Sequence, residues 1–298
     1  MAILADETTR IIIQGITGRE ASAATKDALD YGANVVAGVT PGKGGSEVYG
    51  VPVYDTVRQA VCAHPADASV VSVPAAFAKD AALEALENGI RLVVIVTERI
   101  PRRDVVEVMS RARELRARVI GPNSLGLISP DRTRVGMVGG RATDVRKAYM
   151  RGPAGILSRS GGMTTEVANL LTLHGIGQST CVSIGGDPIV GSTYTDLMPL
   201  FESDTETRAV VIFGEPGGGQ EEALAEYVVA RSPRVPIVAF IAGRFADEMP
   251  GVRFGHAAAI VEGERGSPRE KIARLRKAGV LVAQEFSEIV NLVKQALA

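Results

Sequence analysis

Short apolar runs alternate with helix-length segments along the first part of the chain, and this alternation constrains the fold more than any other feature. The apolar runs are apolar throughout rather than at every second residue, and they occupy 10–14, 34–39, 69–73, 91–97 and 118–120. Continuous apolar strands that alternate with helices are typical of a parallel sheet covered on both faces. The pattern therefore predicts a doubly wound α/β domain with helices at 20–31, 75–88 and 102–115.

The same alternation returns after a weaker stretch. Residues 129–152 are rich in Gly, Arg and Asp and contain few apolar runs, so we predict a link between domains there. Strands are expected beyond it at 154–157, 178–184, 209–213, 237–242 and 280–283, with helices at 163–174, 195–202, 219–230, 268–278 and 287–296. A length of 298 residues suffices for two domains. We therefore expect α/β domains at 1–128 and 153–298.

Composition argues against several classes of protein. The formal net charge of −1 does not favour a nucleic-acid-binding surface. Cys62 and Cys181, the two cysteines, form no C-x-x-C pair, so neither a disulfide framework nor a metal site is predicted. The sequence has no run of 18 apolar residues and no signal-peptide pattern at its start, so we expect a cytoplasmic protein without a membrane span.

Glycines and a lysine follow the first two predicted strands. Gly15-Ile16-Thr17-Gly18 follows the first and opens a helix, an arrangement that suits an anion, although glycine also serves ordinary turns. After the second strand, an NAD-binding fold would have an acidic residue for the ribose hydroxyls. This chain has Thr40-Pro41-Gly42-Lys43-Gly44-Gly45 there. Lys43 favours a phosphate on the ribose, and the alternative is a flexible loop with a solvated lysine.

Polar residues also follow the fourth and fifth predicted strands. Val96-Thr97-Glu98 ends the fourth strand, and Gly121-Pro122-Asn123 ends the fifth. Ligands of doubly wound sheets bind beyond the carboxyl ends of the strands. These segments are therefore expected to face the same phosphate-bearing ligand.

The second predicted domain contains the histidine with the strongest functional interpretation. His64 and His174 suit structural roles in a loop and at a helix end, whereas His256 lies in the small-residue stretch Phe254–Ile260 with room around its ring. Glu215 follows a predicted strand and suits a carboxylate that holds an imidazole in one tautomer. Ser158–Gly162 opens a helix, which predicts either an anion site or an ordinary N-cap by Ser160.

These motifs together resemble the α subunits of succinyl-CoA synthetase along nearly the whole chain. The matching segments are 15–20, 39–45, 121–123, 158–161, 178–188, 214–215 and 255–260. The resemblance implies an N-terminal Rossmann-like CoA-binding domain at 1–128, a linker at 129–152 and a flavodoxin-like ligase domain at 153–298 that bears a phosphohistidine.

The resemblance also implies residue roles. His256 matches the histidine that is phosphorylated transiently, and Glu215 matches the acid that orients it. The helix that starts near Gly162 would stabilise the phosphohistidine through its amide groups. The residues implied to contact phosphate or substrate are Ser160, Gly161, Gly162 and Thr165. Those implied to bind CoA are Thr17, Gly18, Arg19, Glu20, Lys43, Val96, Thr97, Glu98 and Asn123.

In this family a separate β subunit, or a fused domain, carries the ATP-grasp fold that binds the nucleotide. The resemblance implies an ATP-grasp β subunit, in an αβ or α2β2 assembly, that binds most of ATP or GTP with Mg²⁺. The implied reaction joins a small carboxylic acid to CoA through the phosphohistidine and an acyl phosphate.

Departures from the family leave the acid substrate open. Thr165 stands where the family has a substrate-contacting tyrosine, Ser124 where it has a cysteine, and Arg99 where it has a glycine. Gly162 and Met163 resemble the corresponding segment of ATP-citrate lyase, so malate, citrate or a sulfonated acid is the alternative to succinate. Alternatives of other classes are an NAD(P)-dependent oxidoreductase, a non-enzymatic CoA-binding protein, and a relative that transfers an acyl or carbamoyl group without nucleotide.

Overall fold

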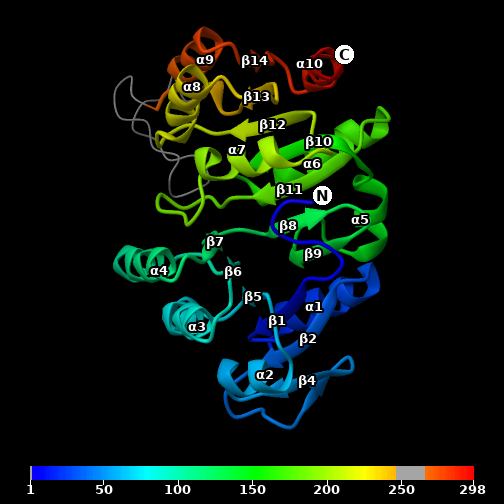
Figure 1. Cartoon of the computed structure of the whole chain (residues 1–298), viewed down its shortest axis with the longest axis vertical. Coiled ribbons are helices and arrows are strands. Elements are labelled where there is room, and N and C mark those ends of the chain that lie inside the picture. The colour runs from blue at the N-terminus through cyan, green and yellow to red at the C-terminus, as the bar shows by residue number, and fades with distance from the viewer. Residues whose placement is uncertain (1, 246–265) are drawn as a thin grey trace.

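The structure is a computed structural model, and it describes residues 2–245 and 266–298. Strands within these residues form two seven-stranded sheets. The sheets are stacked along the long axis of the molecule, with the N-terminal part of the chain at one end and the C-terminal part at the other (Figure 1). The prediction of two mixed α/β units is confirmed.

The first sheet has the strand order β3-β4-β2-β1-β5-β6-β7. Its strands are β1 (Arg10–Gln14), β2 (Asn34–Val39), β3 (Glu47–Val48), β4 (Val51–Tyr54), β5 (Ala68–Val71), β6 (Leu92–Ile95) and β7 (Arg118–Ile120), and its helices are α1 (Arg19–Tyr31), α2 (Val57–Ala63), α3 (Ala75–Glu87) and α4 (Arg102–Glu114). All the pairs are parallel except β3 with β4. The order reverses between β1 and β5, which is the switch point of a Rossmann-type sheet.

The second sheet has the strand order β14-β13-β12-β10-β11-β8-β9. Its elements are β8 (Gly126–Ser129), β9 (Thr133–Gly136), α5 (Ala142–Ala148), β10 (Arg151–Ser158), α6 (Gly161–Leu173), β11 (Gln178–Ser183), α7 (Tyr194–Ser203), β12 (Ala209–Gly214), α8 (Gln220–Arg231), β13 (Ile237–Ile241), α9 (Pro268–Lys277), β14 (Leu281–Val282) and α10 (Glu288–Leu297). From β10 to β14 the order is that of a flavodoxin-like sheet, as expected.

The stretch expected to be a linker carries regular structure instead. Strands β8 and β9 form an antiparallel hairpin, and β8 pairs with the edge of the second sheet at β11. Helix α5 follows within the same stretch. The sequence pattern missed the hairpin because its strands are short and are bounded by glycines. Gly126 and Gly136 allow close backbone approach there: a Cβ on Gly126 would lie 2.0 Å from the carbonyl oxygen of Val135.

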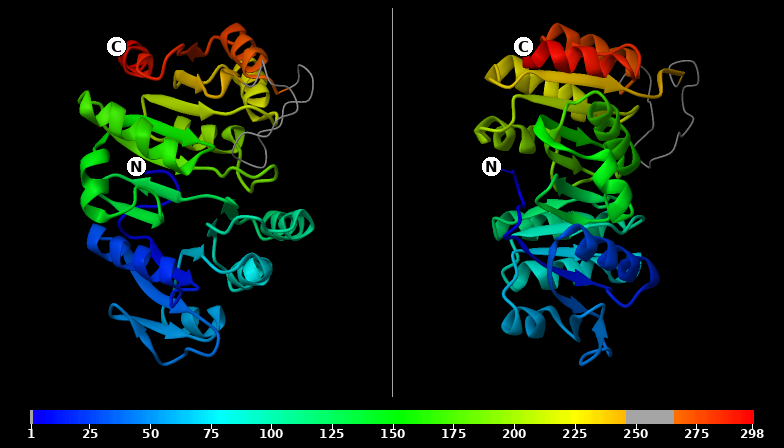
Figure 2. Two further views of the ribbon diagram at one scale, coloured as in Figure 1. Left: turned by 180° about the vertical axis from the view of Figure 1, so that it is seen from behind. Right: turned by 90° about the vertical axis from the view of Figure 1, so that its right-hand side faces the viewer.

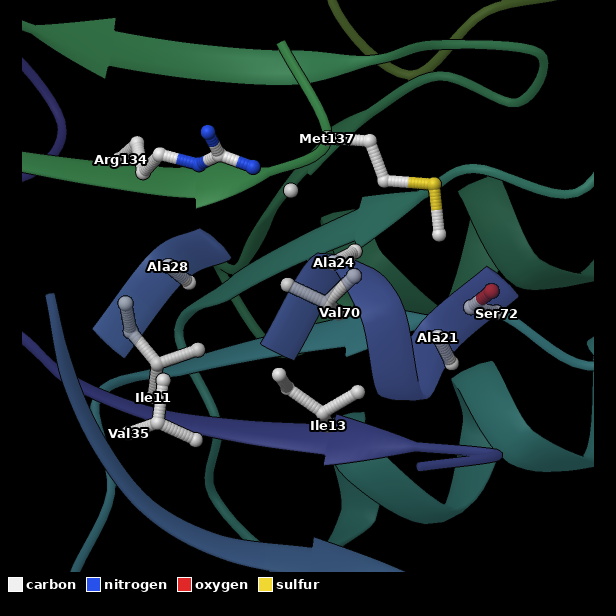
Figure 3. Close-up of a pocket in the computed structure, with 11 residues that line it drawn as sticks. Ile11, Ile13, Ala21, Ala24, Ala28, Val35, Val70, Ser72, Arg134 and Met137 are labelled. Carbon is white, nitrogen blue, oxygen red and sulfur yellow. The ribbon is translucent and has the colours of Figure 1, made fainter. Parts of the chain in front are cut away.

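The hairpin packs against the first sheet and joins the two halves. Helix α1 contacts both β9 and α5, and the views from behind and from the side show these elements where the two sheets meet (Figure 2). Arg134 and Met137 face Ala24 and Ala28 of α1 across a cavity of about 10 Å³, which has room for about one water (Figure 3). Arg134 is buried and donates to the Gly140 carbonyl at 2.7 Å. This cavity is therefore part of the packed joint and is too small for a cofactor.

Candidate functional site

A cavity of about 560 Å³ opens at the carboxyl ends of β1, β2 and β5. It lies at the switch point of the first sheet, between the start of α1 and the face of α3, where a doubly wound fold binds its ligand. Its lining residues are Gln14, Gly15, Thr17, Gly18, Val39, Thr40, Pro41, Ser72, Val73, Pro74, Phe77, Asp80, Ala81 and Glu84. Of the residues predicted to bind CoA, Thr17 and Gly18 belong to this lining.

The floor of the cavity requires glycine at position 15. Gly15 has a φ of +82°, and a Cβ there would lie 2.2 Å from the carbonyl oxygen of Ser72. Its amide donates to the Val39 carbonyl at 2.7 Å, and its own carbonyl accepts the Gly18 amide at 2.9 Å. The turn therefore brings the backbone of β1 close to β2 and β5, and it leaves the start of α1 facing the cavity.

Lys43 lies on the loop that continues from the cavity wall. The Lys43 amide donates to the Thr40 carbonyl at 3.1 Å, and the hydroxyl of Ser46 donates to the Lys43 carbonyl at 2.6 Å. Asp55 accepts the Gly44 amide at 2.8 Å. The backbone of the loop is thus fixed while the Lys43 side chain stays exposed. Arg19 and Glu20, at the start of α1, are exposed too. Within the described structure, none of these three side chains lines the cavity.

The remaining predicted CoA residues lie where β6 and β7 end. The Thr97 hydroxyl donates to the Val73 carbonyl at 2.7 Å, and the Thr97 carbonyl accepts the Asn123 amide at 3.0 Å. Val96 is half-buried, and Glu98 is exposed beside Arg99. These residues are therefore near one another, although within the described structure they do not line the cavity.

Asn123 also reaches the second half of the molecule. Its side-chain amide donates to Asp187 Oδ1 at 3.0 Å, and its carbonyl accepts the Gly186 amide at 3.2 Å. Gly185 approaches so closely that a Cβ there would lie 2.2 Å from the Pro122 carbonyl oxygen. The strand ends of β7 and β11 consequently meet, and they bring the first sheet's ligand edge next to the second sheet.

The start of α6 forms the centre of the second candidate site. The Ser160 hydroxyl accepts the Met163 amide at 3.4 Å, so the ordinary N-cap interpretation of Ser160 holds. Gly161 is required for packing, because a Cβ there would lie 2.4 Å from Leu125 Cγ. Gly162 is exposed and faces open space. The first-turn amides of α6 thus begin at an accessible surface, where amides lacking helical partners favour an anion.

The loop that carries Glu215 lies beside this helix start. It connects β12 to α8, and Arg159, the residue before Ser160, donates to the carbonyl of Gly217 at 3.0 Å and to that of Glu215 at 3.4 Å. The Glu215 amide donates to Glu221 Oε1 at 3.3 Å. Sequence reasoning missed Arg159 and Glu221. The signals available were the arginine between two serines and the acidic pair after the glycines. His256 lies outside the described residues.

Two sequence-family models match the chain. The CoA binding domain matches residues 6–99, and the CoA-ligase family matches residues 157–283. Succinate–CoA ligase (ADP-forming) subunit alpha 1 of Archaeoglobus fulgidus is 50% identical over 297 residues, which cover 100% of this chain and 99% of that protein. The corresponding alpha subunit of Aquifex aeolicus is 45% identical over 299 residues, covering 100% and 95%.

The chain belongs to the family of succinate–CoA ligase α subunits. The expected family resemblance is thereby confirmed, and so is the expected two-part fold. A solved structure supports the fold further: a mutant ATP citrate lyase of Methanosaeta concilii in complex with (3S)-citryl-CoA superposes with a TM-score of 0.93 at 27% identity. The match covers 99% of this chain but 50% of the lyase chain, so this α-subunit chain spans half the length of that protein.

Two of the positions expected to depart from the family pattern have side chains in hydrogen bonds. Ser124 is buried, donates to the Ser183 carbonyl and accepts the Gly126 amide at 2.8 Å. Thr165 shares a hydrogen bond with the Tyr149 hydroxyl at 2.9 Å. Burial raises the pKa of the Tyr149 phenol, so this phenol stays protonated. The phenol of Tyr149, the residue that follows α5, thus reaches the first turns of α6.

Within residues 2–245 and 266–298, no group of three or more His, Cys, Asp and Glu side chains is arranged to hold a metal ion. No helix in the described part of the chain has the length and apolar character needed to cross a bilayer.

Proposed function

We propose that this chain is the CoA-binding, phosphohistidine-carrying α subunit of a carboxylate–CoA ligase. The observation that carries the proposal is identity of 43–50% over the full chain to α subunits named for ADP-forming succinate–CoA ligation. The geometry agrees with it: a large cavity lies at the first switch point, and the Glu215 loop lies beside the exposed start of α6. The match of residues 6–99 to CoA-binding domains favours CoA over the dinucleotide of an oxidoreductase.

CoA would occupy the switch-point cavity of the first domain. The start of α1 after Gly18 and the charge of Lys43 suit its phosphates, and α3 supplies the apolar wall with Phe77 and Ala81. The extended arm of CoA would pass the ends of β6 and β7, where Thr97 and Asn123 lie. That path leads from the first sheet toward the second, because Asn123 contacts Asp187.

The proposed chemistry has three balanced transfers. A His256 nitrogen displaces the nucleoside diphosphate from the γ-phosphorus of ATP or GTP, a carboxylate oxygen of the acid then displaces the imidazole, and the CoA sulfur finally displaces phosphate from the acyl carbon, with loss of the thiol proton. Covalent catalysis divides one difficult step into easier ones. Glu215 would hold the imidazole in one tautomer, and the α6 amides would stabilise phosphoryl charge. Mg²⁺, held mainly by an ATP-grasp β subunit, would neutralise charge on the nucleotide.

The test of this function is transfer of label to one residue. The chain, assembled with its ATP-grasp β subunit and [γ-³²P]ATP, is expected to acquire an acid-labile, base-stable phosphate that is absent from His256→Asn. Glu215→Ala is expected to slow the labelling without removing the site. Label that persists in His256→Asn would overturn the proposed role, and preferential binding of NADH over CoA in calorimetry would favour an oxidoreductase instead.

The acid is proposed to be succinate or a related acid such as malate, citrate or a sulfonated acid. Relatives named for succinate favour the first, whereas the likeness to a lyase solved with (3S)-citryl-CoA favours a larger acid. Thr165 has no ring, unlike the tyrosine expected there from the family pattern, and its hydroxyl shares a hydrogen bond with Tyr149. A comparison of kcat/KM across these acids, with and without Thr165→Tyr, decides between them because that ratio measures differential transition-state binding. A succinate preference unaltered in Thr165→Tyr would show that α6 does not set the specificity.

A further inference from the structure

Charged side chains are buried together beneath the loop that carries Glu215. Arg159 directly after β10, Glu221 in the first turn of α8 and Lys271 in the first turn of α9 have side chains that are 1%, 0% and 0% exposed. Lys271 Nζ pairs with Glu221, and it lies 3.1 Å from Glu222 Oε2. Arg159 Nη1 lies 3.7 Å from Glu221 Oε1. We call Arg159, Glu221, Glu222 and Lys271 the buried charge cluster.

The cluster directs its hydrogen bonds at the backbone of the loop. Arg159 donates to the carbonyls of Glu215 and Gly217, and Glu221 accepts the Glu215 amide. On the other side of the loop, Lys271 donates to the Gly218 carbonyl at 3.3 Å. The loop is therefore held from β10, α8 and α9 at once.

The loop has little conformational preference of its own. Gly217 and Gly218 have φ values of +76° and +65°, and glycine populates this region about as readily as any other. Holding such a segment in one conformation costs conformational entropy. The buried charge cluster supplies the fixed contacts, although burying ions is itself expensive unless they are paired and hydrogen-bonded.

Arg159 also links the loop to the start of α6. It directly precedes Ser160, the N-cap of α6, while its guanidinium contacts the loop carbonyls. Arg159 therefore connects the backbone of the Glu215 loop directly to the residue that caps α6. Neither the CoA cavity nor the α6 cap explains why two cations and two carboxylates are buried at this place.

We propose that Arg159, Glu221 and Lys271 are positioning residues that hold the Glu215 loop against the start of α6 for phosphoryl transfer. The inference rests on the proposed function, in which Glu215 orients His256. None of the three is assigned contact with the transferred group; each acts through the backbone of the loop.

The decisive variant is Glu221→Gln, which keeps the shape of the side chain and an acceptor for the Glu215 amide but removes the charge that pairs with Lys271. In the assembled α/β enzyme with [γ-³²P]ATP, its rate of histidine phosphorylation is expected to fall about tenfold or more. The CoA dissociation constant, measured by calorimetry, is expected to stay within about twofold, because the CoA cavity belongs to the other sheet. The control is Glu206→Gln, which removes a carboxylate that pairs with Arg132 and Arg151 away from the loop. Its rate of histidine phosphorylation is expected to equal that of the wild type.

A double-mutant cycle separates positioning from a general loss of structure. If the cluster acts through Glu215, then Glu221→Gln added to Glu215→Ala is expected to lower the rate by less than about threefold further, since interacting residues are not additive. A full, additive loss in that background, or an unchanged rate in Glu221→Gln alone, would overturn the inference.

A charge-balanced variant guards against unfolding. Glu221→Gln combined with Lys271→Met leaves Arg159 opposite Glu222, so the buried net charge is unchanged, but it removes the bond to the Gly218 carbonyl. Native circular dichroism with phosphorylation still slowed at least fivefold is the expected result, and a wild-type rate would contradict the inference. A wild-type enzyme that never becomes labelled would instead refute the proposed function, which keeps the two failures distinct.

Discussion

Lys43 illustrates how much a single residue can be understood from sequence. Its position after β2, among glycines and without an acidic residue, indicated a phosphate-bearing ligand, and the structure shows its backbone fixed by Thr40, Ser46 and the Asp55–Gly44 contact. Those contacts fix the backbone of the loop but not the conformation of the Lys43 side chain. Its role in binding CoA therefore stays a prediction.

We predict that Lys43→Ala weakens CoA binding by about tenfold or more. A hydrogen bond to a charged group contributes about 1.5–3 kcal/mol, and about 1.4 kcal/mol corresponds to a tenfold change. The matched control is Lys26→Ala, because Lys26 is an exposed lysine of the same domain that pairs with Asp30 on α1. Calorimetry with CoA measures both variants, and equal affinities would exclude a role for the Lys43 charge.

The residues that sequence reasoning missed share a physical property. Arg159, Glu221 and Lys271 are charged but buried, whereas a charged residue in a sequence is ordinarily assigned to a solvated surface. Their burial follows from the meeting of three elements distant in sequence, and no local pattern reports that meeting. Gly15, in contrast, was identified because a turn between a strand and a helix has a local signature.

The longer helices and most parallel strands were predicted well, because continuous apolar runs alternate with helix-length segments along the chain. Strand β7 occupies the residues expected, and α4 ends one residue earlier than predicted. The β3–β4 and β8–β9 hairpins were not predicted, since their pairing depends on neighbours rather than on long apolar runs. Helices α2 and α5 were missed as well, because each has only 7 residues. Short antiparallel strands carry little sequence signal of their own.

Two helix starts allow the capping role of Ser160 to be separated from any role in phosphoryl transfer. Ser160 caps α6, and Thr193 caps α7 in a capping box with Asp196. We predict that Ser160→Ala and Thr193→Ala each lower the free energy of unfolding by about 0.5–2 kcal/mol. Only Ser160→Ala is expected to slow histidine phosphorylation, because α6 starts beside the Glu215 loop. Chemical denaturation and [γ-³²P]ATP labelling measure the two effects. Equal labelling rates in Ser160→Ala and Thr193→Ala would show that Ser160 acts as a helix cap alone.

At the level of the entire chain, the ligase-type domain and the CoA-type domain are packed as one body. Ile3 donates its amide to Thr180 Oγ1 at 3.3 Å, and the Ser129 hydroxyl donates to the Ala5 carbonyl at 2.8 Å. A single hydrophobic cluster contains Ile11 of β1 together with Leu127 of β8 and Val182 of β11. The N-terminal segment therefore belongs structurally to both sheets, which the chain order alone did not suggest.

This shared core predicts that binding at one sheet stabilises the other. A ligand present at a hundred times its dissociation constant adds about 2.7 kcal/mol to the free energy of unfolding. The gain applies to every part of the chain that unfolds together with the binding site. The hydrophobic cluster extends from β1 to β11, and Ile3 and Ala5 bond residues of the second sheet. Both sheets are therefore expected to unfold in one transition. Calorimetry should then show a single peak that CoA moves as a whole, with hydrogen exchange slowed in β10 and β12 as well as in β1. Two peaks, of which CoA moves one, would show that the two sheets unfold separately.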